Sequence, residues 1–121
     1  MTLGISLEGL RVLVVEDDFY LATDAQSALE EAGATVVGPA ARAEDALRLI
    51  DAEPVDCAVV DINLGDGPSF AFAAALRERA IPFLFTTGYD AAAIPEEFRS
   101  VERLEKPIED AELVAAVNRL R

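Results

Sequence analysis

The stretch from Cys57 to Gly67, CAVVDINLGDG, decides the fold of this chain. Its apolar run holds a single carboxylate, Asp61, and a glycine-containing turn follows at once. A short apolar run bounded by turn residues is typical of a strand that is buried on both faces, as in the middle of a parallel sheet. We expect Asp61 at the carboxyl end of that strand, where open α/β sheets place their ligand sites. A carboxylate there is unfavourable unless it has a partner or a chemical role.

The composition indicates one folded domain with an acidic surface. The chain has 121 residues, of which 52% are hydrophobic, and a formal net charge of −13 without any histidine. We therefore expect a single domain over residues 1–121, with no output domain. The acidic balance argues against nucleic-acid binding, which needs clustered Lys and Arg. No signal-peptide pattern and no apolar run of roughly 20 residues occurs, so we expect a cytoplasmic protein that does not enter the membrane.

Strand and helix patterns alternate along the rest of the chain. Besides the strand that begins at Cys57, apolar runs predict strands over 10–15, 34–38 and 81–86. Segment 101–105, VERLE, can form a fifth strand only at a sheet edge, because its charged residues could not all be buried. Helical periodicity and helix-terminus signals predict helices over 19–32, from 43 to before Pro54, over 68–79 and over 108–120. Segment 90–100 is expected to form only a short or broken helix because Pro95 interrupts it.

Five strand–helix units in succession predict a parallel sheet with helices on both faces. The first, third and fourth strands are continuously apolar and belong inside the sheet, whereas the second and fifth are short or charged and belong at its edges. The flavodoxin-like strand order 2-1-3-4-5 satisfies both conditions. The fold class is therefore a doubly wound α/β domain.

This strand order gathers acidic and basic groups at one edge of the sheet. Glu16 and Asp17 follow the first strand and meet Asp61, while Thr87 follows the fourth strand and Lys106 the fifth. Two carboxylates about 5 Å apart repel by about 3 kcal/mol at an effective dielectric constant of 20. A hard divalent cation relieves this repulsion, and Mg²⁺ is the expected occupant. A carboxylate beside Mg²⁺ can act as a nucleophile and form an aspartyl phosphate.

Four short motifs carry a family resemblance. They are VVED at 14–17, VVDINL at 59–64, TTGY at 86–89 and LEKP at 104–107. In this order and spacing the chain resembles the receiver domain of bacterial two-component response regulators. The resemblance implies that Asp61 accepts a phosphoryl group from a histidine kinase or a histidine phosphotransfer protein.

The resemblance also implies roles for the surrounding residues. Asp17 matches a direct Mg²⁺ ligand, Glu16 matches an acid that acts mostly through water, and the backbone carbonyl of Asn63 matches a further metal ligand. Thr87 matches the switch hydroxyl, and Lys106 matches the lysine that pairs with the phosphoryl group. The bond between Lys106 and Pro107 is expected to be cis.

One position departs from the family pattern. Receivers usually carry Tyr or Phe three residues before the lysine, and this sequence has Arg103 there. Tyr89, two residues after Thr87, resembles the aromatic residue of a receiver subgroup in which this loop takes over the switch. Arg103 and Tyr89 are therefore the switch candidates. The expected surface for a downstream partner protein combines segments 90–100, 101–105 and 108–120, and we expect a monomer or a weak homodimer.

This interpretation describes a signalling switch that catalyses its own phosphorylation and dephosphorylation, rather than an enzyme with a separate substrate. One alternative is a degenerate receiver that binds partners without phosphorylation. Another is a phosphohydrolase of the haloacid-dehalogenase type, which needs an aspartate where this chain has Asn63. A flavin-binding electron carrier needs a Ser/Thr-rich phosphate loop after the first strand, and the acidic EDDF at 16–19 repels phosphate.

Overall fold

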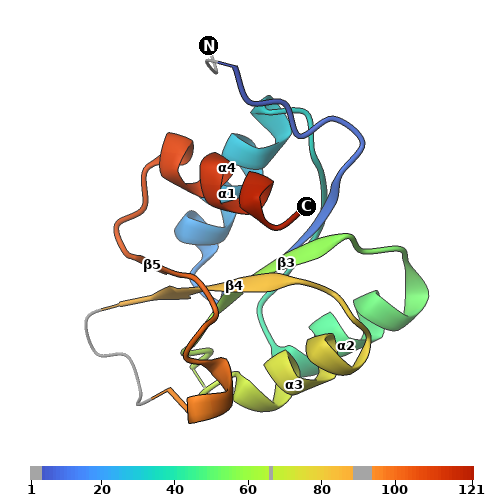
Figure 1. Ribbon diagram of the computed structural model, residues 1–121, viewed down its shortest axis with the longest axis vertical. Helices are drawn as coiled ribbons and strands as arrows, with labels where there is room; N and C mark the ends of the chain where they lie inside the picture. The colour runs from blue at the N-terminus through green and yellow to red at the C-terminus, as the bar shows by residue number, and fades with distance from the viewer. Residues whose placement is uncertain (1–3, 66, 89–93) are drawn as a thin grey trace.

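A five-stranded parallel sheet forms the centre of the molecule (Figure 1). The computed structural model describes residues 4–65, 67–88 and 94–121. The strand order is β2-β1-β3-β4-β5, as the sequence predicts. The strands are β1 (Arg11–Val15), β2 (Thr35–Ala40), β3 (Cys57–Asp61), β4 (Phe83–Thr87) and β5 (Arg103–Glu105).

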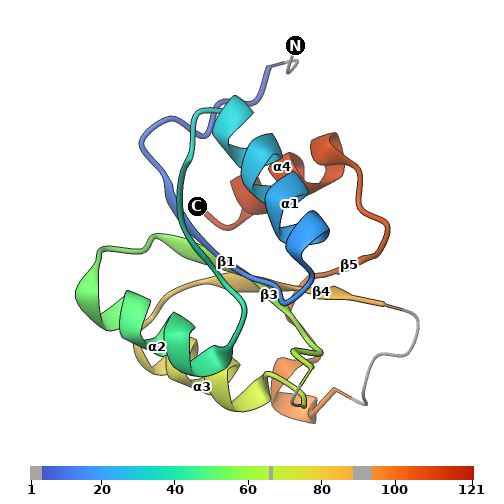
Figure 2. The same ribbon diagram turned by 180° about the vertical axis from the view of Figure 1, so that it is seen from behind.

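In the described part of the chain, four α-helices cover the sheet in two layers. They are α1 (Phe19–Glu31), α2 (Ala43–Ala52), α3 (Phe70–Glu78) and α4 (Asp110–Arg119). Helices α1 and α4 lie together on one face, and α2 and α3 lie on the other (Figures 1 and 2). The doubly wound α/β fold is therefore confirmed. Among the described helices none has both the length and the apolar character needed to cross a membrane.

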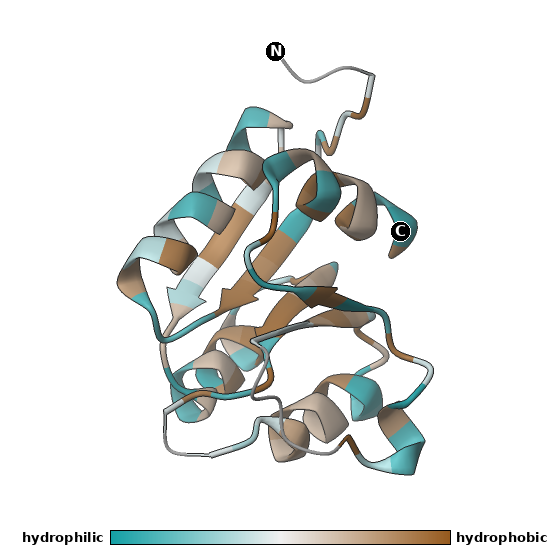
Figure 3. Cartoon of the chain, turned by 90° about the vertical axis from the view of Figure 1, so that its left-hand side faces the viewer, coloured by the Kyte–Doolittle hydropathy of each residue, from teal (hydrophilic) through white to brown (hydrophobic). Residues whose placement is uncertain are grey.

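The sheet separates two hydrophobic cores because successive side chains of a strand point to opposite faces. Val14 and Leu84 belong to the core beneath α1 and α4, whereas Leu13, Val60 and Phe85 belong to the core above α2 and α3. Hydrophobic residues accordingly line the central strands and the helix faces directed at them (Figure 3). Every residue of β3 and β4 is buried, whereas the edge strands β2 and β5 each leave residues exposed.

Two of the boundaries that differ from the sequence prediction have a direct structural explanation. Helix α3 begins at Phe70, so the prediction that Pro68 occupies its first position was wrong: Pro68 instead pairs with Asn63 in an antiparallel bridge of the preceding loop. Strand β2 continues two residues beyond Gly38 because the backbone N–H of Glu16 donates to the carbonyl of Ala40 at 3.0 Å.

Segment 90–100 contains no α-helix within its described residues, 94–100. It holds a single 3₁₀ turn, η1 (Glu96–Phe98), directly after Pro95. The expectation of a short or broken helix therefore holds for this part of the segment, and the described chain has one α-helix fewer than the five predicted.

Phe98 fixes η1 against the rest of the molecule. Its side chain is buried among the rings of Phe70 and Phe85, whose centroids each lie 6.0 Å away. Arg77 of α3 covers the Phe98 ring, with its guanidinium carbon 4.8 Å from the centroid, and donates to the carbonyl of Glu97 at 2.7 Å. Aromatic packing and a hydrogen-bonded cation thus hold η1 beside α3.

We predict that Phe98→Ala lowers the free energy of unfolding by about 3–5 kcal/mol, because it removes a buried ring from a packed aromatic cluster. Phe19→Ala is the matched control, since the Phe19 side chain is 74% exposed and its loss should cost at most about 0.5 kcal/mol. Urea denaturation followed by circular dichroism compares the two. Equal destabilisation by both variants would contradict the anchoring role of Phe98.

Candidate functional site

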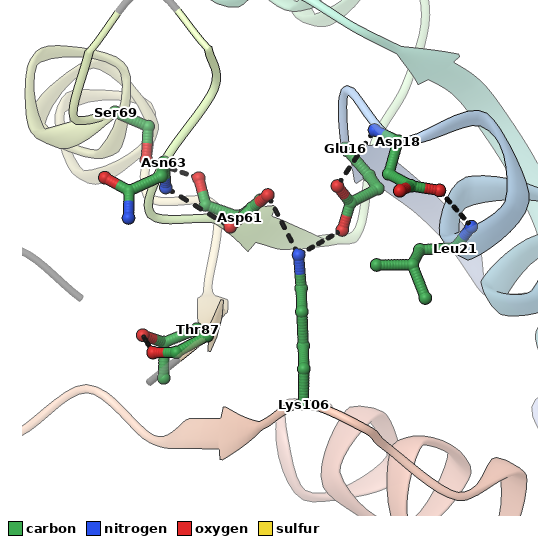
Figure 4. Close-up of polar contacts among 9 residues, drawn as sticks. Glu16, Asp18, Leu21, Asp61, Asn63, Ser69, Thr87 and Lys106 are labelled. Atoms are coloured by element: carbon green, nitrogen blue, oxygen red, sulfur yellow. Dashed lines mark hydrogen bonds and ion pairs between the residues drawn. The ribbon is translucent and has the colours of Figure 1, made fainter. Parts of the chain in front are cut away.

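Lys106 joins two buried carboxylates at the carboxyl edge of the sheet. Its Nζ atom lies 3.0 Å from Oδ2 of Asp61 and 2.8 Å from Oε1 of Glu16 (Figure 4). We call this arrangement the Lys106 bridge. Lys106 is the only lysine in the sequence, and its backbone N–H donates to the carbonyl of Thr87 at 2.8 Å. The end of β5 is thereby tied to the end of β4, which places the ammonium over the acids.

The sheet register explains why these acids meet. Val15 pairs with Val60, so the next residues of the two strands, Glu16 and Asp61, come to the same edge. Burial raises the pKa of Glu16, against the opposing effect of its hydrogen bonds from Lys106 and from the backbone N–H of Asp18. The pKa of Lys106 is also raised, because its bonds to the two carboxylates outweigh the effect of its own burial.

Asp17 adds a third carboxylate to this edge. One carboxylate oxygen from each of Glu16, Asp17 and Asp61 lies within 4.8 Å of the others. Burial, and then the charge of Glu16, raises the pKa of Asp17. A Cβ atom on Gly65, whose φ is +70°, would lie 2.9 Å from Oδ2 of Asp17, so the loop after β3 approaches this carboxylate as only glycine allows. Closely spaced carboxylate oxygens are the hard donors that Mg²⁺ prefers, and the site fits this ion.

The loop between β3 and α3 fixes the backbone around Asp61. The Ser69 hydroxyl donates to the backbone carbonyl of Asp61 at 2.7 Å, and its N–H donates to the carbonyl of Ile62 at 2.8 Å. The N–H of Asn63 donates to Oδ1 of Asp61 at 3.2 Å, so Asn63 lies beside this carboxylate. Ser69 is buried, and sequence reasoning missed it. A serine directly before a predicted helix is a sequence feature that could have drawn attention to this position. Here its hydroxyl donates to the carbonyl of Asp61 at the end of β3 and does not cap α3.

Thr87 and Arg103 form no hydrogen bond or ion pair with the three carboxylates in the described part of the chain. Thr87 ends β4 at the same edge and is buried, but its hydroxyl donates to the carbonyl of Gly88 at 2.9 Å and is turned away from Asp61 (Figure 4). Arg103 is exposed at the start of β5. Tyr89 lies outside the described residues. The Lys106–Pro107 bond is cis, as the family resemblance implies.

We predict that Asp17→Asn stabilises the metal-free protein at pH 7 by about 0.5 kcal/mol, a small value because Asp17 is exposed to screening solvent. The raised pKa of Asp17 means that its charged form is less favourable in the folded than in the unfolded protein. The Asp17 carboxylate therefore destabilises the folded protein at pH values above its folded-state pKa. This destabilisation disappears once the pH falls below 3.8, where the folded and unfolded states are both protonated.

Urea denaturation in a chelator at several pH values measures this difference. Asp18→Asn is the control, because Asp18 caps α1 through the N–H of Leu21 at 3.0 Å and asparagine caps equally well. If Asp17→Asn destabilises the metal-free protein at pH 7, the carboxylates do not repel one another as described.

Comparisons with known proteins agree with this geometry. The model of the response regulator receiver domain family matches residues 12–118. The solution structure of SdrG from Sphingomonas melonis Fr1 is 32% identical, covers 92% of this chain and 95% of its own, and has a TM-score of 0.82. The solution structure of the BeF3-activated conformation of SdrG from Pseudomonas melonis Fr1 is also 32% identical, with 89% and 92% covered and a TM-score of 0.78.

A CheY-like response regulator receiver domain from Methylobacillus flagellatus is 27% identical, with 93% of this chain and 98% of that chain covered and a TM-score of 0.75. The search of curated protein sequences found no match. The family model spans nearly the whole chain, and the aligned structures share its sheet and helices. This chain belongs to the response regulator receiver domain family.

Proposed function

We propose that Asp61 accepts a phosphoryl group from the phosphohistidine of a histidine kinase or a histidine phosphotransfer protein, and that the domain acts as a cytoplasmic signalling switch. The observation that carries the proposal is the Lys106 bridge. It holds the buried carboxylate of Asp61 at the sheet edge beside the Lys106 ammonium. This positive charge can pair with the negatively charged oxygens of an incoming phosphoryl group. Family membership supports the same reaction.

The residues at this edge also favour a role for Mg²⁺. Asp17 and Asp61 would hold the ion directly with the backbone carbonyl of Asn63, and Glu16 would act mostly through water. The close carboxylate oxygens and the glycine beside Asp17 support this ligand set. When bound, the ion neutralises negative charge between the carboxylates and the phosphoryl oxygens.

The transfer step needs little from the protein besides position and charge. A carboxylate oxygen of Asp61 attacks the phosphorus, the P–O bond forms as the P–N bond breaks, and the imidazole leaves and takes up a proton. Lys106 moves its contact from the Asp61 carboxylate to the phosphoryl oxygens. Water later attacks the phosphorus, which restores the carboxylate and releases inorganic phosphate. The domain thus catalyses both steps on itself and has no separate substrate.

Phosphorylation then changes the surface by shifting a conformational equilibrium. The Thr87 hydroxyl gives up its bond to Gly88 and turns toward the phosphoryl group, which moves the adjoining backbone at Gly88. The structure of the BeF3-activated conformation of SdrG supports such a second state in this family. The partner surface comprises segment 94–100, β5 and α4. Arg103 lies on it, and Tyr89, two residues after Thr87 in the sequence, is the other candidate for the switch.

Acetyl phosphate tests the proposal directly. After incubation with Mg²⁺, intact mass spectrometry should show one phosphoryl adduct that hydroxylamine removes, because an acyl phosphate is labile to this nucleophile. The adduct should be absent from Asp61→Asn and from samples treated with a chelator. Mg²⁺ binding without any adduct would contradict the proposal and favour the degenerate receiver, whereas steady hydrolysis of free phosphate esters would favour the phosphohydrolase.

We further predict that Ser69→Ala slows adduct formation by roughly 10-fold. Loss of a residue that hydrogen-bonds to the ligands of a metal site typically lowers metal affinity or activity by about 10- to 100-fold. The change removes the hydrogen bond to the carbonyl of Asp61 and loosens the loop that carries Asn63. Ser27→Ala on the exposed face of α1 is the control. A Ser69→Ala rate equal to that of the control would show that the hydroxyl does not position the acceptor.

A further inference from the structure

A cavity of about 150 Å³ lies between α1, α4 and the sheet. Apolar side chains from three elements form most of its wall, among them Ala25 of α1, Val59 of β3 and Leu113 of α4. Glu16 and Lys106 contribute one end. Asp17, Asp61, Asn63 and Thr87 do not line it, so the cavity is separate from the phosphorylation site although it shares the Lys106 bridge as a wall.

Thr86 supplies a polar group inside this cavity. Its side chain is 5% exposed and lies on the sheet face that Leu84 shares, toward α1 and α4. No hydrogen bond joins its hydroxyl to any described residue, and the oxygen is open to the cavity rather than sealed in the core. Because this hydroxyl is open to the cavity and has no partner among the described residues, it can bond to a ligand that brings a hydrogen-bonding group.

The rim of the cavity is negatively charged. Asp24 on α1 and Asp110 on α4 both line it and are exposed, and neither forms an ion pair within the described chain. Glu16 shares Lys106 with Asp61, whereas the two rim carboxylates have no basic partner in the described part of the chain. An apolar interior below unpaired carboxylates matches a ligand that has an apolar body and a cationic end.

We propose that this cavity is a binding site for a small aromatic amine with a single ring. A ring fits the space, since a dry apolar cavity of about 150 Å³ in another protein takes up benzene. The ring packs against Ala25, Val59 and Leu113, while the ammonium lies at the rim within reach of Asp24 and Asp110 and completes the hydrogen bonding of Thr86.

Benzylamine is the probe for this site. Titration of the ¹⁵N-labelled protein without Mg²⁺ should produce saturable amide shifts in ¹H–¹⁵N spectra that concentrate at Ala25, Thr86 and Leu113. Benzyl alcohol keeps the ring and loses the charge, so it should bind roughly 2- to 5-fold more weakly for each exposed carboxylate that the amine contacts. The readout needs no phosphorylation, so its outcome does not depend on the proposed function.

Two variants separate the ring from the charge. Ala25→Leu fills the cavity and should abolish the shifts, whereas Thr23→Leu on the exposed face of the same helix should retain them. Asp24→Asn combined with Asp110→Asn should make benzylamine and benzyl alcohol bind equally. Thr86→Val tests the hydroxyl and should weaken benzylamine binding. Shifts that persist in Ala25→Leu, or that scatter over the acidic surface without saturation, would overturn the proposal.

Discussion

The ion pairs of one lysine hold the acidic edge of this domain together. The sheet register brings Glu16 and Asp61 side by side, and both are buried where like charges repel strongly. Lys106 lies 2.8 Å and 3.0 Å from their carboxylate oxygens, and the hydrogen bond from its N–H to the Thr87 carbonyl fixes its backbone. Breaking such a pair leaves an uncompensated buried charge, so the edge depends on this contact.

The same contact links the resting structure to the proposed switch. A phosphoryl group on Asp61 brings new negative charge to the position that Lys106 already faces, so the lysine can exchange one anionic partner for another. Thr87, whose hydroxyl now bonds to Gly88, stands at the end of the adjacent strand and is the next group to respond. Beyond it, Phe98 and Arg77 fix η1 on α3, which sets the resting position of this part of the proposed partner surface.

Sequence patterns predict the parts of this structure that depend on burial and chain order. Apolar runs and the alternation of strands with helices predict the strand order, which assigns Asp61 and Lys106 to the same edge of the sheet. The parts that depend on individual hydrogen bonds were not predictable. The Ser69 hydroxyl donates to the carbonyl of Asp61, eight residues earlier, and Pro68 pairs with Asn63 across a loop. The Thr87 hydroxyl donates to the carbonyl of the next residue, Gly88. Neither periodicity nor composition specifies such contacts.

Nuclear magnetic resonance of the lysine side chain tests the central claim most directly, because selective ¹⁵N-lysine labelling gives a single Nζ signal from Lys106. Without ligand, this signal should titrate above the ordinary lysine pKa, since the two carboxylates stabilise the charged form. Adding Mg²⁺ and beryllofluoride, which mimics a phosphoryl group, should shift the signal with 1:1 stoichiometry, and Asp61→Asn should abolish the shift. A Lys106 signal that stays unchanged while fluorine spectra show bound beryllofluoride would contradict the account.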